Sequence, residues 1–311
     1  MTELAPQELR VLVAVAEAGG FSAAAHRLGI TQSAVSHSVR GSEAKVGAVL
    51  FDRGRAGASP TPAGERAVAL GRRILRLYEV LGAEARAAGR AAAGPGTAEG
   101  VLRIAAFRSA ALHLLPPALE RLAARHPGIR PEIRVVRELG PGTAGEVAAG
   151  RADLAIATLS GPASRPLSGP LPGPPSGLPD GLPDGLLSGE LTREAYSLVH
   201  PAGHPDPKAL PLLDWDENCG SYTRDWWRAQ DWIPRATVKA EDDAMVLTMV
   251  GRGLGMAILP ELSLREATDA VEIAGLGPQG PVRRVGYVTT AELASTLAVR
   301  ALIRELRVER G

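Results

Sequence analysis

Apolar side chains along the first 50 residues recur at the spacing of short amphipathic helices, with glycines between them. Residues 6–19 predict one helix, because apolar positions recur every three or four residues and Gly19 and Gly20 then provide an end. Its apolar face consists of Leu9, Leu12, Val13 and Ala16. A helix of this kind buries one face against a neighbour, so we expect it to belong to a small helical domain.

The next two segments predict a pair of helices joined by a tight turn. Residues 22–28 form a short helix opened by Ser22, and after a turn at 29–30 a third helix runs from a cap at Thr31 to about Val46. The inward positions are Ala24, Ala25, Leu28, Val35 and Val39, and the outward positions of the third helix are Gln32, Ser33, Ser36, His37 and Arg40. Small alanines allow the close crossing that a helix-turn-helix requires.

Residues 48–62 interrupt the helical pattern with turn residues around two apolar positions. Leu50 and Phe51 are predicted to anchor a two-stranded wing, with Arg53 and Arg55 at its tip. Helix resumes at Thr61 followed by Pro62, a cap and a first-turn proline.

The predicted helix that follows is long and carries a regular apolar stripe. It spans 30 residues, about 45 Å at 1.5 Å per residue, and the stripe consists of Ala67, Leu70, Ile74, Leu77 and Leu81. This spacing is typical of a helix that pairs with another helix. The sequence leaves open whether the partner is a second chain or the protein's own domain.

Beyond about residue 100 the pattern changes to alternating strands and helices. Predicted strands are 101–107, 131–137, 153–158, 191–199, 236–240, 255–259, 271–274 and 282–289, and predicted helices are 109–125, 143–150, 242–252 and 291–308. This alternation predicts an open α/β sheet. Residues 94–100 form a hinge before it, and residues 160–185, with 8 Pro and 6 Gly, form an exposed insertion.

Composition and charge narrow the class of protein. One Cys in 311 residues excludes a disulfide scaffold, and no apolar run is long enough to span a membrane. The N-terminus lacks a secretory signal, so we expect a cytoplasmic protein. The net charge of +1 conceals an asymmetry, because residues 1–90 carry 12 Arg or Lys against 8 Asp or Glu. The basic end is therefore the one that contains the predicted helix-turn-helix.

The first 66 residues resemble the winged helix-turn-helix of LysR-type transcriptional regulators. The resemblance rests on 16–22 (AEAGGFS), Ala24, Ala25, Leu28, 32–36 (QSAVS), Glu43, Gly47, Leu50, Phe51, Arg53, Thr61, Ala63 and Gly64. Looser matches follow at 150–156 (GRADLAI) and 251–260 (GRGLGMAILP). The chain departs from the family at Ser42 and Pro60, where the family has apolar residues, and we expect looser packing of the wing there.

The resemblance implies a fold and a division into parts. The fold class is α/β, with an N-terminal, mainly α-helical winged helix-turn-helix, a long linker helix, and a two-lobed effector domain like a periplasmic binding protein. The predicted parts are a DNA-binding domain at 1–60, a dimerisation helix at 61–93, a hinge at 94–100, a first lobe at 101–158 and 263–311, and a second lobe at 159–262.

The resemblance also implies a function in reading promoter DNA as a homodimer or homotetramer. Candidate DNA-binding residues are Ser22, Thr31, Gln32, Ser33, Ser36, His37, Arg40, Arg53 and Arg55. Gln32 and Arg40 have donors suited to base edges, whereas Arg53 and Arg55 suit phosphates. Thr31 serves equally as a helix cap. RNA polymerase stays open as a further partner, and no membrane partner is expected.

A small-molecule effector is expected between the two lobes. Candidate contacts are Arg108, Ser109, Ala110, Thr158, Tyr222, Thr223, Asp242 and Asp243. Arg108 beside Ser109 suggests a small organic acid, whereas Asp242 and Asp243 also suit plain helix caps. Trp226, Trp227 and Trp232 form either an apolar wall or core. No cofactor, and no metal at the six histidines, is predicted.

Other functions fit the residues less well. The glycines of 251–255 precede a predicted strand, whereas a dinucleotide-binding loop must follow one, so an enzyme is not expected. A solute-binding protein is opposed by the attached DNA reader, and an architectural DNA protein by the predicted sensor. Cys219 lacks a second thiol and suits a buried, inert position better than a redox sensor. Activator and repressor stay open.

Overall fold

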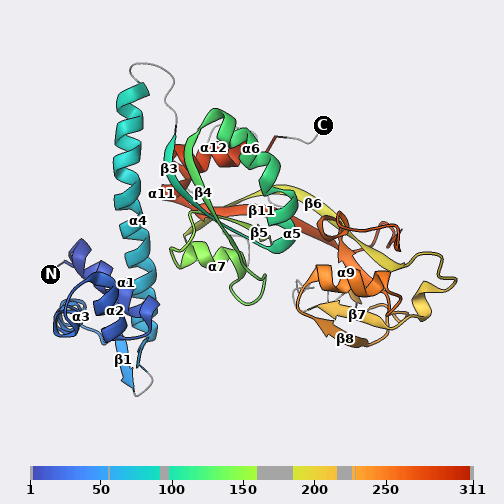
Figure 1. Cartoon of the computed structure of the whole chain (residues 1–311), viewed down its shortest axis with the longest axis horizontal. Coiled ribbons are helices and arrows are strands. Elements are labelled where there is room, and N and C mark those ends of the chain that lie inside the picture. The colour runs from blue at the N-terminus through green and yellow to red at the C-terminus, as the bar shows by residue number, and fades with distance from the viewer. Residues whose placement is uncertain are drawn as a thin grey trace.

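The computed structural model describes residues 3–54, 57–91, 98–159, 185–215, 226–227 and 229–308. Figure 1 shows a small helical domain at the lower end of one long helix, with an α/β part beside that helix and extending away from it. The predicted hinge lies largely, and the 160–185 insertion almost wholly, outside the described residues. Among the described helices, none is long and apolar enough to cross a membrane.

The N-terminal domain is a three-helix unit with a two-stranded wing. Its elements are α1 (Pro6–Ala18), α2 (Phe21–Leu28), α3 (Gln32–Val46), β1 (Phe51–Gly54) and β2 (Gly57–Pro60). The two strands pair antiparallel from Phe51 opposite Pro60 to Gly54 opposite Gly57. Val35 and Val39 are fully buried, and Leu50 and Phe51 join them in one core, as predicted.

The first two helices differ in detail from the prediction. Val13 and Ala16 are only half-buried, whereas Val11 and Val15 are buried, because α1 packs on α2 and α3 and also on the long helix. The second helix begins at Phe21 with Gly20 as its N-cap, so Ser22 lies inside the first turn and does not open the helix.

The wing is fixed to the helices by the Glu43 carboxylate and by a backbone hydrogen bond. Oε1 of Glu43 accepts hydrogen bonds from the amides of Leu50, at 2.8 Å, and Phe51, at 3.3 Å. The amide of Ala58 donates to the Gly19 carbonyl at 2.9 Å. The looser packing expected at Ser42 is not found, because this side chain is fully buried and its hydroxyl donates to the Ser38 carbonyl at 3.0 Å.

The long helix α4 (Pro62–Ala91) leaves most of its predicted apolar stripe uncovered. The Thr61 hydroxyl accepts from the Gly64 amide at 3.0 Å, which confirms the predicted cap. Leu70, Ile74 and Leu81 are exposed, and Tyr78 adds a fourth large side chain to this face. Ala67 and Leu77 are half-buried against the cores of the chain's own domains, which leave the other three members of the stripe uncovered.

The α/β part is organised around one seven-stranded sheet with strand order β10-β6-β11-β5-β3-β4, and β9 also pairs with β6. The strands are β3 (Glu99–Ala106), β4 (Gly128–Val135), β5 (Leu154–Thr158), β6 (Leu186–Pro201), β9 (Ala257–Pro260), β10 (Val271–Gly275) and β11 (Val282–Thr290). β3 runs parallel to β4 and β5, whereas β11 is antiparallel to β5 and β6. The helices of the first lobe are α5 (Arg108–His113), α6 (Leu115–Arg125), α7 (Gly142–Ala148), α11 (Ala291–Ala294) and α12 (Leu297–Leu306).

The long strand β6 connects two lobes. Residues 186–195 pair with β11 in the first lobe, and residues 196–201 pair with β9 and β10 in the second. The second lobe also contains a 3-10 turn (Pro207–Ala209), β7 (Leu212–Trp215), β8 (Ala236–Ala240), α9 (Asp243–Gly251) and α10 (Glu261–Leu264). Because β10 belongs to this pairing, the second lobe extends past the predicted boundary at residue 262.

Two predicted helices are each divided in the structure. The helix expected at 109–125 is interrupted at Leu114, because Pro116 and Pro117 lack an N–H and fit only the first turn of a new helix. The helix expected at 291–308 is interrupted at Thr296, which is extended and precedes α12. β7 and α10 were not predicted at all.

Candidate DNA-binding face and effector site

The outer face of α3 presents polar side chains that the rest of the described chain leaves free. Gln32, Ser33, His37 and Arg40 are exposed, and the last three follow at spacings of four and three on one face of the helix. Within the described residues, Gln32, His37 and Arg40 make no hydrogen bond or ion pair. A free polar face of this width is what a recognition helix needs to enter the major groove.

Of three further candidate DNA contacts, one caps a helix as predicted, one faces inward and one is exposed. Thr31 is a helix cap, since its hydroxyl accepts from the Ala34 amide at 3.2 Å. Ser36 is 8% exposed and lies beside Val35 on the inner side, so it is not part of the outer face. Ser22 is exposed in the first turn of α2.

The wing arginines are less free than the sequence suggests. The Arg53 guanidinium lies 4.8 Å from the centre of the Phe21 ring and 4.0 Å from a Glu43 oxygen. Arg53 therefore ties the wing to α2 and α3 while about half of its side chain stays exposed. Arg55 lies outside the described residues.

Arg108 joins the two lobes. It stands at the start of α5, after β3, and its Nη1 donates to Oδ1 of Asp243 at 2.9 Å while its Nη2 donates to Oε2 of Glu266 at 2.7 Å. Burial disfavours its charge, but these two carboxylates outweigh that effect and raise the pKa of Arg108 above its ordinary value. The Arg108 side chain is still 30% exposed.

The other predicted effector contacts divide into those near this bridge and those away from it. Asp243 is buried and bonds the Ser263 hydroxyl, whereas Asp242 caps α9 by accepting from the Met245 amide at 2.8 Å. Thr158 is half-buried at the end of β5. Ala110 is fully buried in the core of the first lobe, so its side chain does not line a site. Tyr222, Thr223 and Cys219 lie outside the described residues.

A buried ion pair beside Ser109 was missed from the sequence. Nε of Arg283 in β11 donates to Oε1 of Glu194 in β6 at 2.7 Å, and Oε2 of Glu194 accepts from the Leu262 amide at 2.8 Å. Nη2 of Arg283 reaches the Ser109 hydroxyl at 3.5 Å, and its guanidinium lies 4.6 Å from the centre of the Phe107 ring. No sequence motif marks this pair, since its members are 89 residues apart.

The tryptophans of the second lobe belong to an apolar cluster. Trp226, Trp227 and Trp232 pack against buried side chains that include Tyr196 and Ile258. This favours core over an effector wall. Among the residues that the structure describes, no cluster of three or more His, Cys, Asp or Glu could hold a metal ion.

Comparison with known proteins decides the family. The family model "Bacterial regulatory helix-turn-helix protein, lysR family" matches residues 6–65, and the "LysR substrate binding domain" matches residues 95–310. The chain belongs to the LysR family of transcriptional regulators. A regulator with a helix-turn-helix domain and a two-lobed effector-binding domain is therefore the biochemical class of this protein.

Named relatives agree with this assignment. Probable HTH-type transcriptional regulator LrrA from Synechococcus elongatus is 33% identical over 314 residues, which cover 97% of this chain and 95% of the relative. Full-length OxyR from Pseudomonas aeruginosa, solved as a variant, has a TM-score of 0.67 at 22% identity over 99% of this chain and 96% of its own. Full-length CbnR in complex with its target DNA has a TM-score of 0.61 at 19% identity over 98% and 99%. The two solved structures support the LysR fold, and the relatives are named as regulators and not as enzymes.

Proposed function

We propose that this LysR-type regulator binds promoter DNA as a homo-oligomer, either a dimer or a tetramer, and that an effector held between its lobes changes this binding. The observation that carries the proposal is the combination of a free polar face on α3 with an uncovered apolar stripe on α4. Pairing of two α4 helices would hold two copies of α3 at a fixed separation, as a partly symmetric DNA site requires.

DNA recognition is assigned first to Arg40 and Gln32, with Ser33 and His37 beside them. Arginine pairs bidentately with guanine and glutamine with adenine, and each such contact discriminates by about 1–3 kcal/mol. Ser22, Thr31 and the exposed part of Arg53 are better suited to phosphates, which bind without regard to sequence. Arg55, which the sequence places at the tip of the same wing, is assigned the same role.

Arg40→Ala tests the recognition face. Binding sites are first selected from random DNA with the unaltered protein, and affinity is then measured for the selected and for scrambled DNA. We expect the variant to lose about 1–3 kcal/mol on the selected site and little on scrambled DNA, with an unchanged oligomeric mass. Arg10→Ala in α1 removes the same charge from the same domain and serves as the control. Equal discrimination in both variants would contradict the assignment.

The effector is proposed to be a small organic acid that binds Arg108. An incoming carboxylate would replace Asp243 or Glu266 as a partner of this guanidinium. The neighbouring Ser109 is 3% exposed and its hydroxyl accepts from Arg283, so we propose that it supports the site from beneath. Because Asp243 and Glu266 belong to the second lobe and Arg108 to the first, such an exchange would alter the contact between the lobes.

A melting-temperature screen tests this effector class. We expect a panel of small mono- and dicarboxylates to include compounds that raise the melting temperature, while the amines and neutral amides of the same carbon skeletons do not. Ser109→Leu should blunt this shift and the effector response, yet leave basal DNA binding intact. A rise in melting temperature with amines and not with acids would show instead that the carboxylates of Asp243 and Glu266 select the ligand.

A regulator of promoter DNA acts where the DNA is, so we place this protein in the cytoplasm. Contact with RNA polymerase is included in the proposal for the case in which the protein activates transcription. Mapping its binding sites across a genome would name the neighbouring genes and, through their pathway, the effector.

A further inference from the structure

The α/β part is docked onto α4 of the same chain through a buried ion pair. Nε of Arg76 in α4 donates to Oδ1 of Asp153 at 2.6 Å, and Nη2 donates to Oδ2 at 2.7 Å. Arg76 is 9% exposed and Asp153 is 1% exposed. The geometry is bidentate, the form in which an arginine fixes the orientation of a carboxylate as well as its position.

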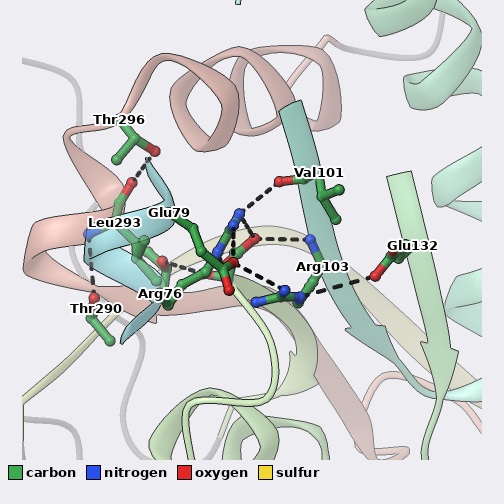
Figure 2. Close-up of polar contacts among 10 residues, drawn as sticks. Arg76, Glu79, Val101, Arg103, Glu132, Thr290, Leu293 and Thr296 are labelled. Atoms are coloured by element: carbon green, nitrogen blue, oxygen red, sulfur yellow. Dashed lines mark hydrogen bonds and ion pairs between the residues drawn. The ribbon is translucent and has the colours of Figure 1, made fainter. Parts of the chain in front are cut away.

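The same arginine also holds the first strand of the α/β part. Nη2 of Arg76 donates to the Val101 carbonyl at 2.6 Å, and Nη1 donates to Glu79 at 3.0 Å. Figure 2 shows Arg76 between Glu79 of its own helix and the strand that carries Val101 and Arg103. Burial opposes the charge of Arg76, yet the bonds to Asp153 and Glu79 prevail and raise its pKa. Arg76 therefore keeps its positive charge at physiological pH.

Gly150, three residues before Asp153, makes the second contact with α4. Gly150 has φ +70°, and a Cβ placed on it would lie 2.8 Å from Cβ of Arg72 and 3.1 Å from the Ala69 carbonyl oxygen. Only glycine combines this backbone conformation with so close an approach to the helix. Residues 150–153 thus form a docking segment that fits α4 at one place.

This contact lies at the opposite end of the strands from the effector site. β3 and β5 are parallel, and Asp153 directly precedes β5; its carboxylate accepts from the Arg103 amide, in the middle of β3, at 2.9 Å. At the opposite end, Thr158 is the last residue of β5 and Arg108 follows β3. Arg76 also lies roughly 140° around α4 from the exposed apolar stripe, at 100° per residue. Docking and helix pairing can therefore occur together.

We propose that Arg76 is a latch residue, whose bidentate ion pair with Asp153 fixes the angle between the effector domain and the linker helix. A cavity of about 50 Å³ lined by Arg76, Val101, Asp153 and Thr296 lies beside this pair, between α4 and the α/β part. The inference concerns the contact itself and does not depend on the class of effector.

Hydrogen exchange at one backbone amide reports this docking directly. The Leu297 amide at the start of α12 donates to Oε1 of Glu84 in α4 at 2.9 Å, so it is protected only while the domain is docked. In Arg76→Gln we expect this amide to exchange about tenfold faster or more, with the β5–β11 ladder unchanged. Arg86→Gln is the control, because it removes a mostly exposed ion pair to Glu99 between the same helix and the same strand.

Two further variants guard against a simple loss of fold. Arg76→Lys keeps the charge but not the bidentate geometry, so its Leu297 exchange rate should fall between those of the unaltered protein and Arg76→Gln. If both residues act through one ion pair, the double variant Arg76→Gln, Asp153→Asn should accelerate Leu297 exchange by less than the product of the accelerations in the two single variants. The latch is refuted if Arg86→Gln matches Arg76→Gln, or if the β5–β11 amides accelerate as much as Leu297.

Discussion

Arg40, inside α3, and Arg108, at the start of α5, are both exposed at least in part, yet the structure gives them different surroundings. Arg40 has no partner within the described chain, whereas Arg108 bonds carboxylates 135 and 158 residues away. Periodicity in α3 was enough to predict that Arg40 faces outward. No local pattern predicts the partners of Arg108, because they come from another lobe.

Glu146 in α7 gives a prediction about acid stability. Its carboxylate accepts from Nη2 of Arg151 at 2.6 Å and from Nε at 2.8 Å, and these bonds, opposed by burial, lower the pKa of Glu146 from its ordinary 4.5. A carboxyl with a lowered folded pKa stabilises the protein above about pH 4.5 and loses this effect as the pH falls through the folded value.

Glu146→Gln should therefore lower the melting temperature at neutral pH by about 2–4 °C, the shift that roughly 1 kcal/mol produces in a domain of this size. The difference from the unaltered protein should shrink as the pH is lowered below about 4.5 and through the lowered pKa of the folded state. Glu132 is an exposed carboxylate 3.9 Å from Arg103, so Glu132→Gln should change neither the melting temperature at neutral pH nor its dependence on pH. A difference that is constant with pH would contradict the assigned role.

At the scale of elements, the helices and strands were largely predicted, and their interruptions were not. The spans of α1, α3, α4 and β11 agree with the prediction to within about two residues, since each has a clear cap or apolar period. α5 and α6 were predicted as one helix because both share an apolar face. Pro116 and Pro117 divide them, a signal that was present in the sequence but outweighed by the periodicity.

The junction between the wing and α4 gives a prediction with a control on the same helix. A Cβ on Gly64 would lie 1.9 Å from the Leu50 carbonyl oxygen, whereas a Cβ on Gly89 would meet nothing within 4 Å. Gly64→Ala should destabilise the N-terminal domain by about 1–3 kcal/mol through overpacking. Gly89→Ala should instead stabilise α4 by up to about 1 kcal/mol. Denaturant unfolding measures the free energy of unfolding of both variants. If both variants were destabilised, or both stabilised, this explanation would be contradicted.

For the whole molecule, the exposed stripe on α4 has the clearest consequence. Leu70, Ile74, Tyr78 and Leu81 lie on one face, and the effector domain occupies another. A face of this kind on a long helix is stabilised by a second helix, so association with another copy of the chain is expected.

Ile74→Glu should shift the protein toward monomer. A charge placed in an apolar helix interface should weaken self-association by roughly hundredfold or more, measured as mass against concentration by light scattering or sedimentation. Glu65→Gln alters an exposed side chain on a different face of α4 and should leave the mass unchanged. An unaltered mass in Ile74→Glu would show that other surfaces hold the copies together.

The sequence by itself determined the class of this protein, because the helix-turn-helix and the strand–helix alternation depend on local spacing, caps and glycines. It also identified α3 as the exposed polar helix. Only the tertiary structure decided that Ser36 faces inward, that Arg108 joins the lobes, and that Arg76 pairs with Asp153, 77 residues away. These outcomes depend on which distant segments the fold brings together, and no spacing along the chain encodes that.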